Sequence, residues 1–286
     1  MRLIAILISL WASRFPDWLD SWRRSDVFFR YADWLRQRVL GGGYWQGPVG
    51  LLAFMLPPVL VVALLQWLVG GWLLGLVIAV VALLFAHGPG RNDHDMDEFL
   101  TAWEQEDLTR AQRSSLALSG ALEGPATAEE LPQEALQGLF WQAYRRVLGP
   151  MFWFVLLGAW GAILFRFAYL AKEYADVRHE ADEPFERAVS SFLYVLDWIP
   201  TRLTALGLGL AGSFVHAMQG WRDVAPDRNP RRLVIRAAEG ALNMPLTSLT
   251  PDAVTAIASE ARSLITRTTL VWLAVIALAT IFGWLG

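Results

Sequence analysis

Apolar stretches long enough to cross a lipid bilayer constrain this chain more than any other feature. A spanning helix needs about 20 mainly apolar residues to cross roughly 30 Å of hydrocarbon. Such stretches lie at residues 49–69, 151–170, 199–217 and 269–285, with a shorter one at 72–86. The sequence therefore predicts an all-α, polytopic membrane protein with about five spanning helices. Two prolines at 57–58 predict a kink in the first span, and Gly70 with Gly71 predicts a tight hairpin into the second.

The apolar and charged stretches divide the chain into segments of different character. We predict an N-terminal interfacial and amphipathic segment (1–46), a transmembrane hairpin (47–86), a cytoplasmic helical loop (87–149), a transmembrane pair with a short acidic periplasmic loop (150–219), a cytoplasmic helical region (220–268) and a C-terminal transmembrane helix (269–286). The apolar run at 3–11 after Arg2 is too short to span and lacks a small-residue cleavage site. We expect this run to be retained near the membrane interface.

The distribution of arginine predicts the orientation of the chain in a bacterial inner membrane. Residues 13–46 and 220–268 are rich in arginine, whereas residues 171–192 are mainly acidic. Cytoplasmic loops carry an excess of basic residues. We therefore expect the N-terminal region and the arginine-rich segments in the cytoplasm, and the turn at Gly70, the acidic loop and the C-terminus in the periplasm.

The composition excludes several classes of function. Hydrophobic residues make up 55% of the chain and charged residues 18%, so part of the chain must face water. There is no cysteine, which excludes disulfides, zinc-cysteine sites, iron-sulfur clusters and thiol catalysis. The formal net charge is -3, and no basic stripe with interleaved aromatic residues is present. We expect no nucleic-acid partner.

The segments outside the bilayer are also predicted to be helical. Thr127 and Glu130 form a capping-box pattern, and Thr250 before Pro251 predicts that the last helix begins upstream, in water. Helical spacing then links two sets of mainly apolar residues: Leu136, Leu139, Phe140, Ala143 and Val147, and Val27, Tyr31, Trp34, Leu35 and Arg38. These faces could pack on one another, on the membrane surface or on a partner, and we favour packing on one another.

The segment Gly207-Leu208-Gly209-Leu210-Ala211-Gly212 matches the dinucleotide-binding fingerprint letter for letter. That fingerprint functions only between a strand and a helix. Because these glycines lie inside an apolar stretch, we predict that they allow close helix packing instead.

Acidic residues after the second apolar stretch resemble a calcium loop. Asp93, Asp95, Asp97 and Glu104 take its first, third, fifth and twelfth places, but Glu98 stands where the turn requires glycine. A helix N-terminus, where acids are favoured, explains the same residues, and we prefer it. His87 and His94 are candidate ligands by type, but a solvated loop is the simpler interpretation. We expect no metal site and no cofactor here.

A charged hexapeptide, Asp197-Trp198-Ile199-Pro200-Thr201-Arg202, stands at the head of the 199–217 stretch. Charges at the mouth of an apolar span are functional candidates by default. In the structural alternative, Asp197 caps the helix, Pro200 occupies its first turn and Arg202 extends to lipid phosphates. Arg166 is the expected salt-bridge partner of Asp197.

Four motifs resemble those of the AmpE family of inner-membrane proteins, and the resemblance runs through most of the chain. They are Pro150-Met151-Phe152-Trp153, Gly158-Ala159-Trp160-Gly161, Leu196-Asp197-Trp198-Ile199-Pro200-Thr201-Arg202-Leu203 and Ile276-Ala277-Leu278-Ala279-Thr280-Ile281. The resemblance implies a regulatory protein tied to β-lactamase induction. AmpE is in turn similar to the CobD/CbiB membrane synthases, which condense a corrin carboxylate with an aminopropanol phosphate using ATP.

Two departures from the synthase pattern imply that the corrin chemistry is lost. The synthases carry an acid- and asparagine-rich segment where residues 141–149 read Trp-Gln-Ala-Tyr-Arg-Arg-Val-Leu-Gly, and Asn-Thr-x-Asp where residues 168–171 read Ala-Tyr-Leu-Ala. Carboxylates suited to magnesium and ATP are missing at these places.

Three hypotheses about function follow from the resemblance and the residues. The first is a membrane regulator that binds a small-molecule or cell-wall-derived ligand, a protein partner or a second copy of itself, with candidate residues Asp197, Pro200, Arg202, Arg166 and Arg91. The alternative is a residual magnesium- and ATP-dependent ligase that uses Asp93, Asp95 or Asp97. A transporter ranks last, because Gln66 is the main polar residue within the spans.

Overall fold

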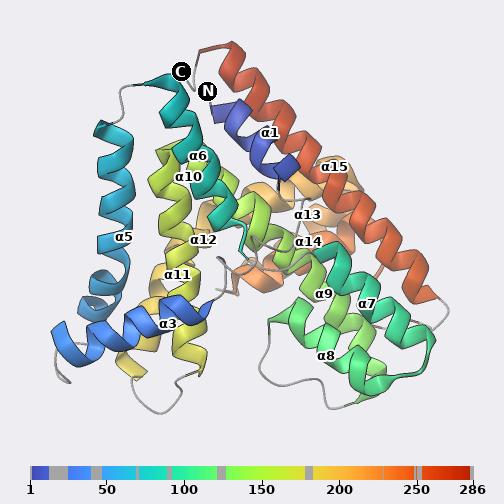
Figure 1. The fold of residues 1–286 in the computed structure, drawn as a ribbon. Coiled ribbons are helices and arrows are strands. Elements are labelled where there is room, and N and C mark those ends of the chain that lie inside the picture. The colour runs from blue at the N-terminus through green and yellow to red at the C-terminus, as the bar shows by residue number, and fades with distance from the viewer. Residues whose placement is uncertain are drawn as a thin grey trace. The chain divides into compact units, whose positions relative to one another are not determined.

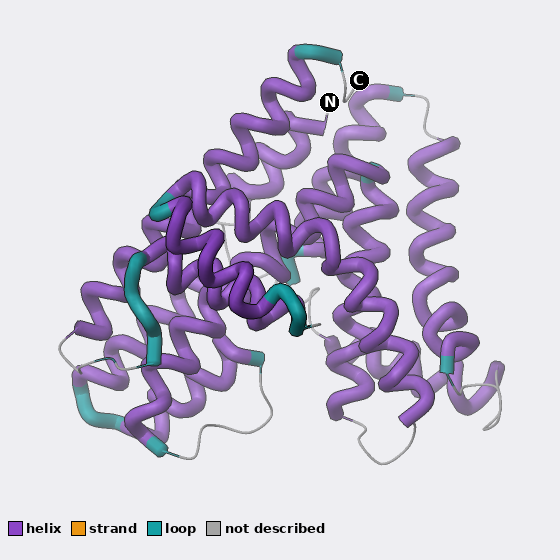
Figure 2. Tube along the Cα trace, turned by 180° about the vertical axis from the view of Figure 1, so that it is seen from behind, coloured by secondary structure: helices purple, strands orange, loops and turns teal. Residues whose placement is uncertain are grey.

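The computed structural model describes residues 2–12, 25–39, 47–68, 71–88, 92–120, 127–177, 183–227, 229–247, 249 and 253–283. Within these ranges every regular element is helical, and Figure 2 shows no strand. The predicted all-α class is therefore confirmed. The chain forms two compact units, the first made of Met1–Pro89, Gly149–Asp197 and Ile276–Gly286, and the second of Gly90–Leu148 and Trp198–Val275.

The first unit is built around helix α11 (Ala159–Val177), which packs on α5 (Pro48–Leu68), α6 (Trp72–Ala86) and α10 (Gly149–Leu157) (Figure 1). The first unit also contains α1 (Arg2–Ala12), α3 (Ser25–Trp34) with its π-helical extension η1 (Leu35–Val39), and the first part of α12 (Glu183–Ala211). The N-terminal apolar run thus forms a helix, which packs on α6 and α10.

Aromatic rings fill the centre of this unit. Phe167 of α11 lies 5.4 Å from Phe28 of α3, 5.6 Å from Phe54 of α5 and 6.0 Å from Phe85 of α6, measured between ring centroids. Tilted and edge-on rings at these distances gain favourable quadrupole contacts in addition to burial. Phe167 of α11 therefore packs against α3, α5 and α6.

The apolar face predicted for α3 is only partly correct. Val27 and Trp34 are exposed, whereas Ala32 and Leu35 are buried and Phe28 joins the aromatic cluster. The α-helical hydrogen bonding of α3 gives way to a π-helical turn at Leu35. Val27 and Trp34 both precede this turn, so the change of helical period does not account for their exposure.

Residues 151–170 were predicted to form one span, but they fold back on themselves at Gly158. Helix α10 ends at Leu157 and α11 begins at Ala159, with Gly158 between them at a φ of +81°. Gly149 approaches the ring of Phe165, and Gly161 approaches the carbonyl group of Trp153, so the two helices form an antiparallel hairpin. Glycine permits this turn because it adopts positive φ without a steric penalty.

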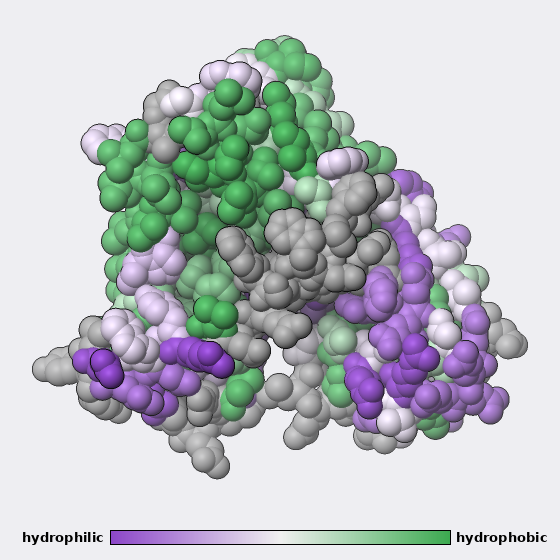
Figure 3. Space-filling model, in the orientation of Figure 1, coloured by the Kyte–Doolittle hydropathy of each residue, from purple (hydrophilic) through white to green (hydrophobic). Residues whose placement is uncertain are grey.

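Among the described helices, α5 and α15 (Val254–Ile281) are both long enough and apolar enough to cross a bilayer. Helix α5 lies within one residue of the expected bounds at each end and continues through Pro57 and Pro58. Helix α6 is apolar but only 15 residues long. Hydrophobic side chains cover the visible faces of α5 and α6 (Figure 3). Two of the described helices thus satisfy length and hydropathy, and the expected number of about five spanning helices stays a prediction.

The second unit contains three packed helices from the 87–149 segment: α7 (Asn92–Glu104), α8 (Leu108–Ser119) and α9 (Leu131–Ala143). Leu136, Leu139, Phe140 and Ala143 of α9 are buried, and α9 packs on α8 and α7. The expected packing of this face on the apolar face of α3 stays a prediction. The predicted capping box is wrong. Thr127 precedes a single 3-10 turn, η2 (Ala128–Glu130), and its side chain makes no capping hydrogen bond. Pro132 instead occupies the first turn of α9, and a π-helical turn, η3 (Tyr144–Leu148), follows.

The stretch at 199–217 is not one helix either. Helix α12 begins at Glu183 and ends at Ala211, and α13 (Phe214–Val224) starts after a break at Gly212 and Ser213. Helix α13 packs closely against α14 (Pro230–Leu242), and a β-carbon at Gly212 would lie 2.5 Å from the carbonyl oxygen of Ala241. The predicted role of the glycine segment in helix packing is confirmed.

The last helix begins far upstream of its apolar part, as predicted. Helix α15 runs without interruption from Val254 to Ile281, and Val254, Ala258 and Leu264 are buried in the second unit. The N-cap expected at Thr250 lies outside the described residues.

Candidate functional site

Arg166 of α11 is a buried cation at the C-terminal end of α6. Its side chain is 9% exposed, and the guanidinium carbon would lie 3.4 Å from a β-carbon at Gly88. The last carbonyl groups of a helix carry partial negative charge, which stabilises a cation at this position. Arg166 also pairs with Glu173, with 3.5 Å between Nη1 and Oε1. These two residues are seven positions apart, which places them on one face of α11.

Asp197 and Tyr169 form the second part of the same cluster. Asp197 is 2% exposed and Tyr169 is 6% exposed, and the tyrosine hydroxyl donates a 2.7 Å hydrogen bond to Oδ2 of Asp197. A short hydrogen bond to a carboxylate offsets part of the cost of burying it. Tyr169 lies three residues after Arg166, on the same face of α11. We refer to Arg166, Tyr169, Glu173 and Asp197 as the α11 cluster.

The structure assigns Asp197 a different role from a helix cap. Fourteen residues of α12 precede it, so Asp197 cannot be the N-cap of a helix that starts at 199. Pro200 is likewise in the interior of α12 and is buried. Glu173 is one partner of Arg166 and Tyr169 is one partner of Asp197. The direct ion pair expected between Arg166 and Asp197 stays a prediction.

Arg202 contacts its own helix. Its guanidinium carbon lies 4.1 Å from the ring centroid of Trp198, and its Nη1 donates a 2.7 Å hydrogen bond to the Trp198 carbonyl oxygen. This arrangement combines a cation-π contact with a backbone hydrogen bond. Arg91, the remaining candidate, lies outside the described residues, so its place in the site stays a prediction.

The acidic residues that resembled a calcium loop lie on helix α7, not in a loop. Asp97 pairs with Arg262 at 2.7 Å, and Asp95 lies 4.0 Å from Arg146. The helical interpretation is therefore confirmed, while the side chain of Asp93 lies outside the described residues. Among the described side chains, no three His, Asp or Glu groups come together in a way that could hold a metal ion.

The two histidines have different environments. His87 is buried at the end of α6, where its Nδ1 lies 2.5 Å from the carbonyl oxygen of Leu83. His94 is exposed on α7. The solvated loop expected for both histidines is therefore wrong for His87.

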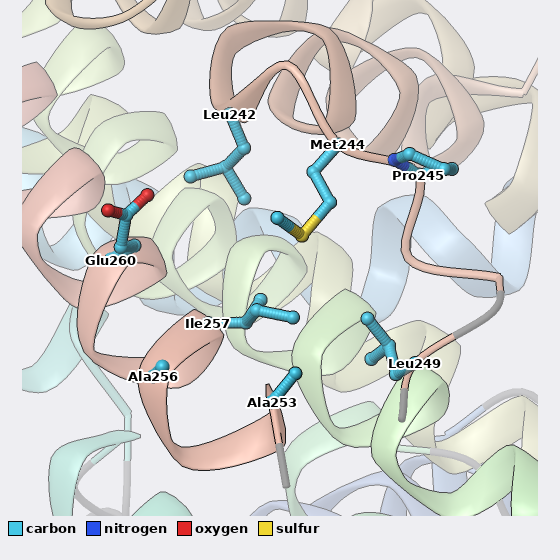
Figure 4. A pocket seen from close by; sticks show the side chains of 8 residues that line it. All are labelled: Leu242, Met244, Pro245, Leu249, Ala253, Ala256, Ile257 and Glu260. Atoms are coloured by element: carbon cyan, nitrogen blue, oxygen red, sulfur yellow. The ribbon is translucent and has the colours of Figure 1, made fainter. Parts of the chain in front are cut away.

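Sequence reasoning missed Tyr169 and Glu173. Their spacing of three and seven residues from Arg166 was the available signal, because such residues share a helix face. It also missed an apolar pocket of about 420 Å³ in the second unit, beside the start of α15. Glu260 is the one charged residue of its lining. The lining side chains, shown in Figure 4, are those of Leu242, Met244, Pro245, Leu249, Ala253, Ala256, Ile257 and Glu260. Without several convergent polar groups, this pocket is a weaker site candidate than the α11 cluster.

Burial changes the pKa of three groups outside the apolar helices, and it raises the pKa of Tyr31. Burial, reinforced by the hydrogen bond from its hydroxyl to Asp33 at 2.8 Å, raises the pKa of Tyr174, although Arg36 opposes this effect. Burial also lowers the pKa of Arg231, with Glu134 opposing and Arg145 adding to the shift. The raised pKa keeps the Tyr174 hydroxyl protonated at neutral pH.

The helices and the α11 cluster define a class of protein. It is an all-helical protein with long apolar helices and a buried set of ionisable side chains, and such sets mark functional positions in membrane proteins. The chain belongs to the AmpE family, whose sequence model, described as regulatory signalling modulator protein AmpE, matches residues 19–286. Proteins of this family reside in the inner membrane.

Two curated proteins are similar to this chain in sequence. The chain is 28% identical to the cobalamin biosynthesis protein CobD of Stutzerimonas stutzeri over 229 residues, which cover 77% of this chain and 74% of that protein. It is 26% identical to Protein AmpE of Shigella flexneri over 218 residues, which cover 73% of this chain and 74% of that protein. No solved structure matches the chain.

Proposed function

We propose that this protein is an inner-membrane regulator of AmpE type, linked to β-lactamase induction and cell-wall recycling. We further propose that it binds a small cell-wall-derived molecule, or a partner protein, at the α11 cluster. The observation that carries the proposal is the burial of Arg166, Asp197 and Tyr169 in one unit of a membrane protein. Family membership and the similarity to Protein AmpE of Shigella flexneri support the regulatory role.

The energetic cost of the cluster supports a functional role. Removing a charge from water costs several kcal/mol, and a buried ion pair is often no more stabilising than apolar residues of similar size. Arg166 and Glu173 are separated by 3.5 Å, which is longer than a strong charged hydrogen bond. A polar ligand that hydrogen-bonds to either group can therefore compete with this contact.

The test compares point variants with a deletion strain. We expect Asp197→Asn and Arg166→Gln to reproduce the effect of gene deletion on β-lactamase induction and muropeptide pools, with the protein still present in the membrane. Glu260→Gln, an exposed carboxylate at the edge of the apolar pocket, is the control and should behave as wild type. If the deletion itself changes neither induction, envelope stress tolerance nor muropeptide pools, the proposed function is wrong.

The similarity to CobD of Stutzerimonas stutzeri supports a second candidate, a magnesium- and ATP-dependent ligase of the CobD/CbiB type. Asp95 and Asp97 of α7 are two of the three acids expected to hold the metal. Asp95 lies near Arg146 and Asp97 pairs with Arg262. Calorimetry of the purified protein with magnesium-ATP distinguishes the two candidates. Heat of binding together with a thermal shift would favour the ligase, and the absence of both would favour the regulator.

We also propose that the N-terminal region lies in the cytoplasm and the C-terminus in the periplasm. The arginine content of residues 13–46 and 220–268 supports this orientation. A homo-oligomer is compatible with the same function. The mass of the purified protein in solution gives its oligomeric state.

A further inference from the structure

One face of α12 in the second unit is apolar, exposed and interrupted by a single charge. Trp198, Ile199, Leu203 and Leu210 have 46%, 45%, 39% and 65% of their surface exposed. Positions 199, 202 and 203 follow position 198 by one, four and five residues, so the four side chains share one side of the helix. Arg202 is the single charged residue between positions 198 and 211.

The guanidinium of Arg202 is held in place but not neutralised. Trp198 lies beneath it at 4.1 Å, and the Trp198 carbonyl oxygen accepts one hydrogen bond from Nη1. Among the described residues, no carboxylate lies within ion-pair distance of Arg202. The remaining N–H groups of a planar guanidinium suit a bidentate anion such as a phosphate.

We infer that Trp198 and Arg202 form a binding site for the phosphate headgroup of an anionic phospholipid. Three observations point to a lipid. The surrounding face is apolar, as lipid chains require. Tryptophan is enriched at membrane interfaces. An arginine on an apolar face reaches the interface by extending toward phosphate. The inference does not depend on the function proposed for the α11 cluster.

Substitution at position 202 gives the direct test. The full-length protein is purified in detergent, titrated with dioleoylphosphatidylglycerol and examined by native mass spectrometry for retained lipid. We expect Arg202→Gln to weaken lipid retention about tenfold, since a hydrogen-bonded charge contributes on this scale. Arg202→Lys keeps the charge but loses the stacked, bidentate geometry, so we expect an intermediate loss. Trp198→Ala should also weaken retention, because the guanidinium then loses its support.

The matched control is Arg232→Gln. Arg232 is an exposed arginine of the same unit that is already paired with Asp227 at 2.5 Å, so its removal changes the net charge equally without removing an unpaired guanidinium. Retention unchanged in this control but reduced in Arg202→Gln supports the site. Equal losses in both variants would show long-range charge attraction and overturn it.

Three other outcomes would also overturn the inference. One is a wild-type protein that retains no phosphatidylglycerol. Another is displacement of the lipid by millimolar inorganic phosphate, which would identify a soluble anion as the ligand. The third is an Arg202→Gln variant that keeps its lipid but loses a co-purified protein, which would identify the face as a protein interface. Thermal melting of each variant confirms that the comparison is made between folded proteins.

Discussion

The hydrogen bond between Tyr169 and Asp197 gives the sharpest test of the α11 cluster. Both side chains are buried, and the hydroxyl oxygen lies 2.7 Å from Oδ2 of Asp197. Tyr169→Phe removes the donor and leaves a buried acceptor with one bond fewer. Loss of a hydrogen bond to a charged group costs about 1.5–3 kcal/mol. The unfolding equilibrium constant should therefore rise by roughly tenfold to a hundredfold.

A double-mutant cycle separates this bond from other effects of the substitutions. Tyr169→Phe, Asp197→Ala and the double variant are unfolded in mixed micelles by increasing SDS and followed by far-ultraviolet circular dichroism. We expect a coupling energy of about 1.5–3 kcal/mol, because contacting residues deviate from additivity. Tyr194→Phe is the control, since the Tyr194 hydroxyl of α12 has no described hydrogen bond.

Two results would refute this reasoning. One is a Tyr169→Phe variant as stable as Tyr194→Phe. The other is a coupling energy below about 0.5 kcal/mol, the level at which distant sites are additive. Either result would mean that the two groups do not depend on each other in the folded protein.

Three further predictions concern single contacts. Gln66→Leu should destabilise the protein by about 1–3 kcal/mol, because the Ala159 N–H group then loses the acceptor it bonds at 2.9 Å. Gly240→Val should prevent the close packing of α13 on α14, since any β-carbon there would collide with the carbonyl group of His216; we expect a loss of at least about 2 kcal/mol in thermal melts. Because the pKa of Tyr174 is raised in the folded state, its contribution to stability is complete below the unfolded pKa of about 10 and is lost at higher pH. Tyr174→Phe should therefore flatten the decline in stability measured above that pH.

Each of these predictions has its own control. Gln66→Glu retains an acceptor oxygen and should lose less stability than the leucine variant. Gly75→Ala is the control for the glycine substitution, because open space surrounds Gly75 and alanine favours a helix there. If Tyr174→Phe shows the same pH dependence as wild type, other groups account for the alkaline decline.

The sequence was sufficient for the fold class and for several helix bounds. Helix α6 has the predicted limits, and α5 differs by one residue at each end, because each is an uninterrupted apolar run with turn residues beside it. The long α15 was also predicted, since its apolar end continues an amphipathic start. These features depend on local composition, which a single sequence contains.

The errors arose where tertiary contacts override local signals. Hydropathy cannot distinguish a span from a hairpin, and the turn at Gly158 has Gln66 of α5 bonded beside it. Asp197 resembled a helix cap because Pro200 follows it, but packing carries α12 through the proline. Tyr169 was overlooked because its partner lies 28 residues away. The candidate site was therefore half predicted: Arg166 and Asp197 were named, and the residues that contact them were not.

The hairpin at Gly158 changes the parity of membrane crossings. A stretch that folds back returns the chain to the side from which it came, whereas a span delivers it to the other side. The residues that follow α11 should then stay on the same side as the segment before α10. The acidic segment at 171–192 is therefore expected in the cytoplasm rather than the periplasm.

The rest of the predicted orientation is unaffected when α6 is counted as the return half of the predicted hairpin with α5, because the stretch at 199–217 is also interrupted and two expected crossings drop out together. We still expect the arginine-rich region at 220–268 in the cytoplasm and the C-terminus in the periplasm. The chain has no native cysteine, so single cysteines at positions 110 and 176 can be labelled without background. A membrane-impermeant reagent applied to intact spheroplasts should leave both unmodified. In that case the turn at Gly158 determines which side of the membrane the acidic segment faces.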